Sequence, residues 1–215
     1  RAGISALWKV SRNNESAELN TVAVGFNMAP RLNACGRIGD VRLGLRLLTT
    51  DDPVEAEEIA YKLDAENKSR QEIEREIFEE ALVKVAASKP DLHKGLIVIG
   101  DDWHPGVIGI VASRLVEQFY TPTIVLTKVN GLYKGSGRSI EGFHLQQALA
   151  QCADCLESYG GHAQAAGLSV QPEKLAIFQQ RFAEVVQQST TTETFVPTLY
   201  IDGEISVNDL NNDIY

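Results

Sequence analysis

The sequence predicts an α/β protein in which alternating strands and helices build a mixed sheet behind one long helix. Hydrophobic residues make up 44% and charged residues 23% of the 215 residues, which is the balance of an ordinary globular chain. The stretch from Pro53 to Ala87 contains no glycine and no second proline, so it predicts the long helix. Apolar runs then alternate with helical spacing as far as residue 187, which predicts layers of strands and helices.

The first 50 residues are predicted to close a domain whose main part lies elsewhere. Residues 2–10 are predicted to be the end of a helix and residues 13–20 a polar loop. Residues 21–26 are predicted to form a short strand. Residues 31–46 hold four arginines and one aspartate, which gives this segment a net charge of +3. The segment either faces a polyanion or is a basic face exposed only to solvent. The chain does not open on methionine, so we expect a piece of a longer protein.

Residues 51–90 are predicted to form a connecting helix, with Pro53 in its first turn. Twelve acidic and four basic side chains between Asp51 and Glu80 give this segment a charge of −8, against −9 for the whole chain, so the acidity is local. Apolar residues are sparse between Asp64 and Glu72, and a helix that is polar all round bridges two bodies through solvent. A coiled-coil arm is the alternative, although no heptad pattern is sustained.

Residues 91–190 are predicted to form a second domain, and residues 191–215 the start of a β module. Buried or alternating runs predict strands at 96–99, 123–126, 131–136 and 168–170. Helical spacing predicts helices at 105–119, 145–159 and 172–187. After a threonine-rich linker, residues 199–205 alternate like the opening strand of a further module.

Ser136, Gly137, Arg138 and Ser139 have the composition of a phosphate-binding turn between a strand and a helix. Glycine lets backbone amides approach an anion, the hydroxyls donate hydrogen bonds, and a guanidinium offers a two-pronged contact. A plain turn with a surface arginine is the alternative.

A second glycine-rich stretch contains Gly160, Gly161, His162 and Gly167, separated by small residues and one glutamine. Small residues permit a ligand to approach the backbone, and at a helix start they suit anion binding. The alternative is the C-terminal stop of the preceding helix, with His162 in solvent or in the core.

Other polar residues suit packing better than chemistry. Cys152 and Cys155 have CxxC spacing, but one pair and a distant Cys35 make a poor zinc site, and the i, i+3 spacing suits the core face of a helix. His104 is either a ligand contact or the cap of the following helix. Three cysteines favour a reducing, cytoplasmic compartment, and no apolar run reaches the roughly 18 residues of a membrane span.

Four motifs in this order resemble the RecJ family of single-stranded-DNA-specific exonucleases in the DHH phosphoesterase superfamily. They lie at residues 29–40, 103–115, 135–139 and 160–167, around the long acidic helix. In that family, aspartates and histidines of an N-terminal DHH domain bind Mn²⁺ or Mg²⁺, a long helix leads to a DHH-associated domain, and an OB-fold follows.

The resemblance implies four parts. Residues 1–50 would be the tail of the DHH domain, 51–90 the connector helix, 91–190 the DHH-associated substrate-binding domain and 191–215 the truncated start of an OB-fold. The Asp-His-His signature is absent, so we expect no catalytic residue and no metal ligand in this chain, and no activity from the chain alone. The full-length enzyme would hydrolyse phosphodiesters with two metal ions.

The resemblance also implies single-stranded DNA as the partner, digestion from 5′ to 3′, and a role in DNA repair and recombination. The expected nucleic-acid contacts are Arg31, Asn33, Arg37, Ser136, Gly137, Arg138, Ser139, Gly160, Gly161, His162 and Gly167, with His104 as a further candidate. Two alternatives from other classes remain. They are a small DHH-type phosphatase of short oligonucleotides or bisphosphorylated nucleosides, and a noncatalytic nucleic-acid-binding module.

Overall fold

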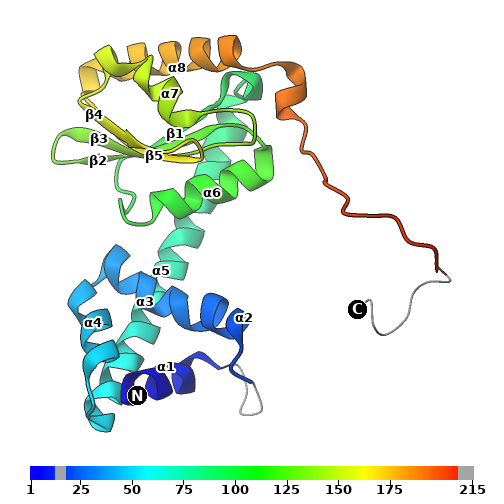
Figure 1. Ribbon diagram of the computed structural model, residues 1–215. Coiled ribbons are helices and arrows are strands. Elements are labelled where there is room, and N and C mark those ends of the chain that lie inside the picture. The colour runs from blue at the N-terminus through cyan, green and yellow to red at the C-terminus, as the bar shows by residue number, and fades with distance from the viewer. Residues whose placement is uncertain (13–17, 208–215) are drawn as a thin grey trace.

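The computed structural model describes residues 1–12 and 18–207, and shows a helical body and an α/β body joined by one long helix (Figure 1). The helical body, at the bottom of Figure 1, holds five elements. They are α1 (Ala2–Ser11), α2 (Thr21–Ala23), a π-helix (Val24–Met28), α3 (Ala29–Ile38) and α4 (Val41–Thr49). The long helix is α5 (Pro53–Ser88), which confirms the predicted connector.

The helical body packs around the first half of α5. Leu7, Leu47 and Leu63 are fully buried there, on α1, α4 and α5. The predicted strand at 21–26 is wrong, because the Asn20 side chain caps α2 by accepting a hydrogen bond from the Ala23 amide at 2.8 Å. Part of the predicted loop at 13–20 lies outside the described residues.

The α/β body contains a five-stranded sheet in the order β1-β2-β3-β5-β4. Its strands are β1 (Leu96–Gly100), β2 (Thr123–Val129), β3 (Leu132–Arg138), β4 (Ser158–Gly161) and β5 (Ala165–Val170). β1 and β2 are parallel and the other pairs are antiparallel. Because parallel strands need a crossover, α6 (Ile108–Phe119) connects β1 to β2, and the mixed α/β fold is confirmed.

Helices cover both faces of this sheet (Figure 1). On one face, Val98 of β1 and Val125 of β2 pack against α5 and α6. On the other face, Ile124 and Leu126 of β2 pack against α7 (Leu145–Ala150) and α8 (Leu175–Ser189). Short 3₁₀ turns lie at Leu92–Lys94, Ala153–Cys155, Pro172–Lys174 and Thr192–Phe195.

The predicted packing role of the two neighbouring cysteines is confirmed. Cys152 and Cys155 are both buried in the cluster beneath α7 and α8, as free thiols. Burial raises the pKa of Cys152 to about 11, so this group is an inert thiol at neutral pH.

Two further predicted elements differ from the structure. The helix predicted at 145–159 ends at Ala150, because residues 158–161 pair with β5 as strand β4. The strand predicted at 199–205 is not formed in the described residues, where Leu199 and Ile201 are 85% and 78% exposed. A strand needs a partner to satisfy its backbone groups, so the β module at 191–215 stays a prediction.

Candidate phosphate-binding site

The two glycine-rich stretches lie in strands and not at helix ends, so the local structure predicted for them is wrong. Ser136 to Arg138 end β3, and Gly160 and Gly161 end β4. β3 has a partner on each side, β2 and β5, which hold these residues extended by hydrogen bonds. The sequence signalled a loop because glycine weakens a strand, but neighbouring strands override that preference.

The register of the sheet nevertheless brings the two stretches together. Ser136 pairs with Gly167, and Gly167 pairs with Gly160, so the three residues form one row across β3, β5 and β4. Because side chains alternate between the faces of a sheet, Arg138 lies on the same face as Ser136. A Cβ on Gly160 would meet nothing within 4 Å, and one on Gly167 only the Gly135 carbonyl at 3.8 Å. This part of the sheet face is therefore an open, glycine-lined floor.

Three of the predicted contacts have other tasks. Gly137 is buried on the opposite face, where a Cβ would lie 2.8 Å from the Leu145 side chain. Gly161 has a φ of 143°, a conformation that favours glycine, and closes the β4–β5 hairpin. Ser139 is buried, and its hydroxyl donates to the Phe143 carbonyl at 2.7 Å. These residues shape the site from behind, while Ser136, Arg138, Gly160 and Gly167 face it.

The start of α6 contributes backbone groups to the same site. His104 begins this turn, since its carbonyl accepts hydrogen bonds from the amides of Val107 at 2.9 Å and Ile108 at 3.2 Å. The His104 Nδ1 atom accepts from the Gly106 amide at 3.1 Å, whereas Val107 occupies the cap position. No side chain among the described residues caps α6 itself. The amides of Val107, Ile108 and Ile110 already donate to backbone carbonyls, so the amide of Gly109 is the one of this turn, among the described residues, that is left for an anion, which the helix dipole also favours.

Gly109 joins this helix start to β3. A Cβ on Gly109 would lie 2.9 Å from Ser136 Oγ and 3.1 Å from Arg138 Nη2, so only glycine lets α6 approach these two side chains so closely. Gly106 and Gly109 lie in the motif at residues 103–115 but were not among the predicted nucleic-acid contacts. The signal that could have found them is a pair of glycines at a helix start, the pattern by which a backbone approaches phosphate.

Arg138 is a half-buried cation without an acidic partner. Its Nη1 atom donates to Ser136 Oγ at 3.1 Å and to the Gly137 carbonyl at 2.8 Å. No ion pair between described residues includes it. Burial, and then the positive charge of Arg37, lowers the pKa of Arg138 below its ordinary value. A buried charge without a counterion is costly, so this geometry suits an anionic ligand.

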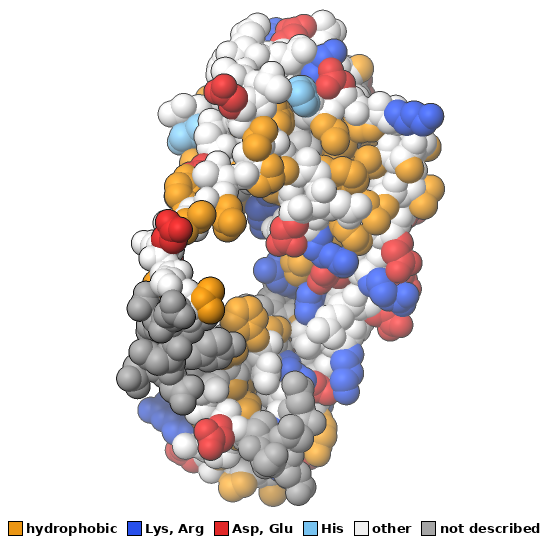
Figure 2. Space-filling view, turned by 90° about the vertical axis from the view of Figure 1, so that its right-hand side faces the viewer, with side chains coloured by type: hydrophobic (Ala, Val, Ile, Leu, Met, Phe, Trp, Pro, Cys, Tyr) orange, Lys and Arg blue, Asp and Glu red, His pale blue; other side chains and the backbone are white. Residues whose placement is uncertain are grey.

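Arg37 approaches the same place from the other body. Its Nη1 atom donates to the Gly106 carbonyl at 3.2 Å, and a Cβ on Gly106 would lie only 2.1 Å from the Arg37 carbonyl oxygen. The C-terminal end of α3 and the start of α6 therefore touch. Figure 2 shows Lys and Arg side chains, interspersed with acidic ones, at this waist between the two bodies.

His162 and Asn33 lie at the margins. His162 is exposed in the β4–β5 turn, where its amide donates to the Ala165 carbonyl at 2.8 Å, and Ala165 pairs with Arg138. Asn33 is exposed on α3. The structure thus places His162 beside the end of β3, and Asn33 on the facing helical body.

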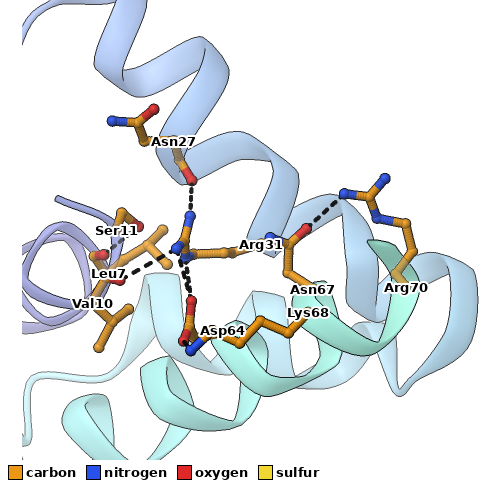
Figure 3. A network of polar contacts seen from close by, with 9 residues as sticks. All are labelled: Leu7, Val10, Ser11, Asn27, Arg31, Asp64, Asn67, Lys68 and Arg70. Carbon is orange, nitrogen blue, oxygen red and sulfur yellow. Dashed lines mark hydrogen bonds and ion pairs between the residues drawn. The ribbon is translucent and has the colours of Figure 1, made fainter. Parts of the chain in front are cut away.

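Arg31 forms an ion pair and hydrogen bonds inside the helical body (Figure 3). Its guanidinium pairs with Asp64 at 2.8 Å and donates to the carbonyls of Asn27 at 2.6 Å and Val10 at 3.3 Å. Asp64 is 9% exposed and Lys68 also pairs with it at 2.8 Å, so α3 covers one side of the predicted polar middle of α5, while Ala65, Lys68 and Ser69 stay exposed. A DNA contact by Arg31 stays a prediction.

The described residues do not fit a resident metal ion, since they contain no group of three or more His, Cys, Asp or Glu side chains placed to hold one. We therefore derive no step through a metal. No helix in the described ranges is long and apolar enough to cross a membrane.

Comparisons with known proteins agree with the fold. Residues 92–188 match the family described as the DHHA1 domain. The chain is 40% identical over 212 residues to the single-stranded-DNA-specific exonuclease RecJ of Bacillus subtilis, a match that covers 98% of this chain and 27% of that protein. The crystal structure of Thermus thermophilus RecJ with Mn²⁺ has a TM-score of 0.77 at 31% identity, and covers 87% of this chain and 27% of that one. A second structure of it, with Mg²⁺, has the same score and identity.

The match over residues 92–188 takes in all five strands of the sheet, so the α/β body is a DHHA1 domain. Over nearly its whole length the chain is similar to RecJ exonucleases, and it spans about a quarter of the length of the B. subtilis relative.

Proposed function

We propose that this chain is the part of a single-stranded-DNA exonuclease that grips the phosphates of its substrate. The observation that carries the proposal is Arg138, a half-buried guanidinium without a carboxylate partner among the described residues, set against the start of α6. RecJ relatives, named as specific for single-stranded DNA, support the kind of anion.

The surroundings of Arg138 explain why a flexible single strand would fit. The row from Ser136 through Gly167 to Gly160 carries one hydroxyl and otherwise only backbone, so a sugar–phosphate chain can lie against the sheet. Arg37 faces this floor from the helical body. Contacts to phosphates carry no base information, so binding would be independent of sequence.

The wider assignment follows from the family. The longer protein would digest DNA from 5′ to 3′ in repair and recombination in the cytoplasm, with Mn²⁺ or Mg²⁺ bound outside these 215 residues. Residues 1–50 would complete a DHH domain, and 191–215 would begin an OB-fold. This chain alone would bind DNA without cleaving it. Its own groups orient the substrate, and misplaced orientation can cost about 10²-fold in rate.

A binding titration tests the proposal. The affinity of the chain for a short 5′-phosphorylated single strand is measured for the wild type, Arg138→Ala and Arg181→Ala. Arg181 is the matched control, because it is a partly exposed arginine on α8, which covers the opposite face of the sheet. We expect Arg138→Ala to weaken binding about tenfold or more, since a hydrogen bond to a charged group contributes about 1.5–3 kcal/mol.

The control should bind like the wild type apart from a small uniform electrostatic loss. Equal affinity for Arg138→Ala and Arg181→Ala would contradict the proposal, as would the absence of binding by the wild type. A duplex of the same length supplies the second comparison, and we expect it to bind more weakly than the single strand.

A further inference from the structure

The loop between β1 and α6 leads into the helix start beside the phosphate site, and its Trp103 and Val107 pack in one apolar cluster with Ile77 of α5. A cavity of about 530 Å³ lies between the loop and α5, with Glu76, Glu80 and Lys84 on the helix side and Asp101 to His104 on the loop side. A loop beside open space needs a specific anchor if His104 and the start of α6 are to stay in place.

Trp103 supplies that anchor. Its indole Nε1 atom donates to Glu80 Oε2 at 2.8 Å, and its carbonyl accepts from the buried hydroxyl of Thr127 on β2 at 2.8 Å. The ring lies directly over Gly100, where a Cβ would be 2.2 Å from it. Among the hydrogen bonds of the described residues, the Trp103–Glu80 bond is the one that joins α5 to this loop.

The anchor is directly connected to the groups of the site. His104 follows Trp103, its carbonyl accepts from the first turn of α6, and its Nδ1 atom accepts from the Gly106 amide. Gly106 contacts Arg37, and Gly109 contacts Arg138. A shift of Trp103 would therefore move the helix start relative to both arginines.

We propose that Trp103 and Glu80 are positioning residues of the phosphate site, through which α5 sets the place of the β1–α6 loop. The inference rests on the proposed function, because its readout is DNA binding. Neither side chain needs to touch the DNA: Trp103 is 6% exposed and is held by Glu80.

Charge makes the test decisive. Removing a carboxylate near a polyanion ordinarily strengthens binding, because repulsion falls. If Glu80 anchors Trp103, removing the Glu80 carboxylate should instead weaken DNA binding. We expect Glu80→Ala and Trp103→Phe to weaken binding of the 5′-phosphorylated single strand about fivefold, the equivalent of one hydrogen bond. Glu80→Gln should restore wild-type affinity, since its amide oxygen still accepts from the indole.

Glu76→Ala is the matched control, because Glu76 lines the same cavity without bonding to Trp103. It should bind as well as the wild type or slightly better. A second measurement is independent of DNA: Trp103 fluorescence in a Trp8→Phe background, which leaves one tryptophan of the two. We expect a red-shifted emission in Glu80→Ala and wild-type emission in Glu80→Gln.

The two proposals fail in different ways. If wild type binds and Arg138→Ala weakens binding, but Glu80→Ala, Glu80→Gln and Glu76→Ala all bind alike, the anchor is wrong and the phosphate site stands. If Arg138→Ala has no effect, the phosphate site is wrong. Weak binding by Glu80→Gln equal to that of Glu80→Ala would also overturn the anchor, because the rescue tests the hydrogen bond itself.

Discussion

Arg31 lies at the contact between α3 and α5, and Arg138 lies at the contact between α6 and β3; the partners of the two guanidinium groups differ. Arg31, in the first contact, has an aspartate and two backbone carbonyls as partners. Arg138, in the second, has one hydroxyl and one carbonyl. An arginine whose charge is neutralised contributes to the fold, whereas an arginine without an acidic partner is suited to an anionic ligand.

The pKa directions express the same difference. Burial alone would raise the pKa of Asp64, but Lys68 and Arg31 outweigh burial and hold it below its ordinary value. No acid among the described residues pairs with Arg138, so burial and the charge of Arg37 lower its pKa. The charge of Arg31 is neutralised within the fold, whereas that of Arg138 is not neutralised by any described residue.

The largest expected effect is that of Arg31→Ala on stability. The change leaves Asp64 buried with Lys68 as its remaining ionic partner, and breaking a buried pair from one side costs about 3–5 kcal/mol. Urea denaturation followed by circular dichroism measures the loss, which we place at about 3 kcal/mol because Lys68 compensates in part. Arg138→Ala is the comparison and should unfold near the wild-type midpoint. A stable Arg31→Ala chain with weakened DNA binding would instead make Arg31 a DNA contact.

A smaller effect is expected from Gly167→Val, and it acts on binding alone. The new side chain would have room, since the nearest atom to a Cβ is the Gly135 carbonyl at 3.8 Å, but it would stand on the glycine-lined floor. We expect binding of the single strand to weaken about tenfold with an unchanged melting temperature. Gly25→Val is the control, because Gly25 has nothing within 4 Å and lies in the helical body. Unchanged affinity for Gly167→Val would show that DNA does not cross this face.

The smallest expected effect is a pH dependence of stability from Asp64. Its pKa is lowered in the folded state, so its contribution is present above the ordinary aspartate value of about 3.9 and is lost as pH falls through the lower, folded value. Asp64→Asn should be less stable than wild type at pH 7, and the difference should shrink below about pH 4. Unfolding free energies at several pH values measure this. A constant difference across that range would mean that Asp64 does not titrate with folding.

Much of the fold could be predicted from the chain. The long helix is indicated by Pro53 and the glycine-free run that follows it. The buried strands are indicated by the apolar stretches around Val98 and Val125, because these signals are also local. The secondary structure was predicted wrongly where it depends on pairing between strands that are distant in the chain. Gly160 and Gly161 indicate the end of a helix, yet these residues pair with β5 and form part of the edge strand β4.

Residue types alone show which side chains are chemically suited to a phosphate, namely an arginine, hydroxyls and glycines. Which of these lie together depends on the fold. Register put Ser136 beside Gly167 and turned Gly137 to the opposite face, while packing gave Arg31 a carboxylate and gave Arg138 none. The physical reason is that a side chain's role depends on which groups share its low-dielectric surroundings, and those groups come from distant parts of the chain.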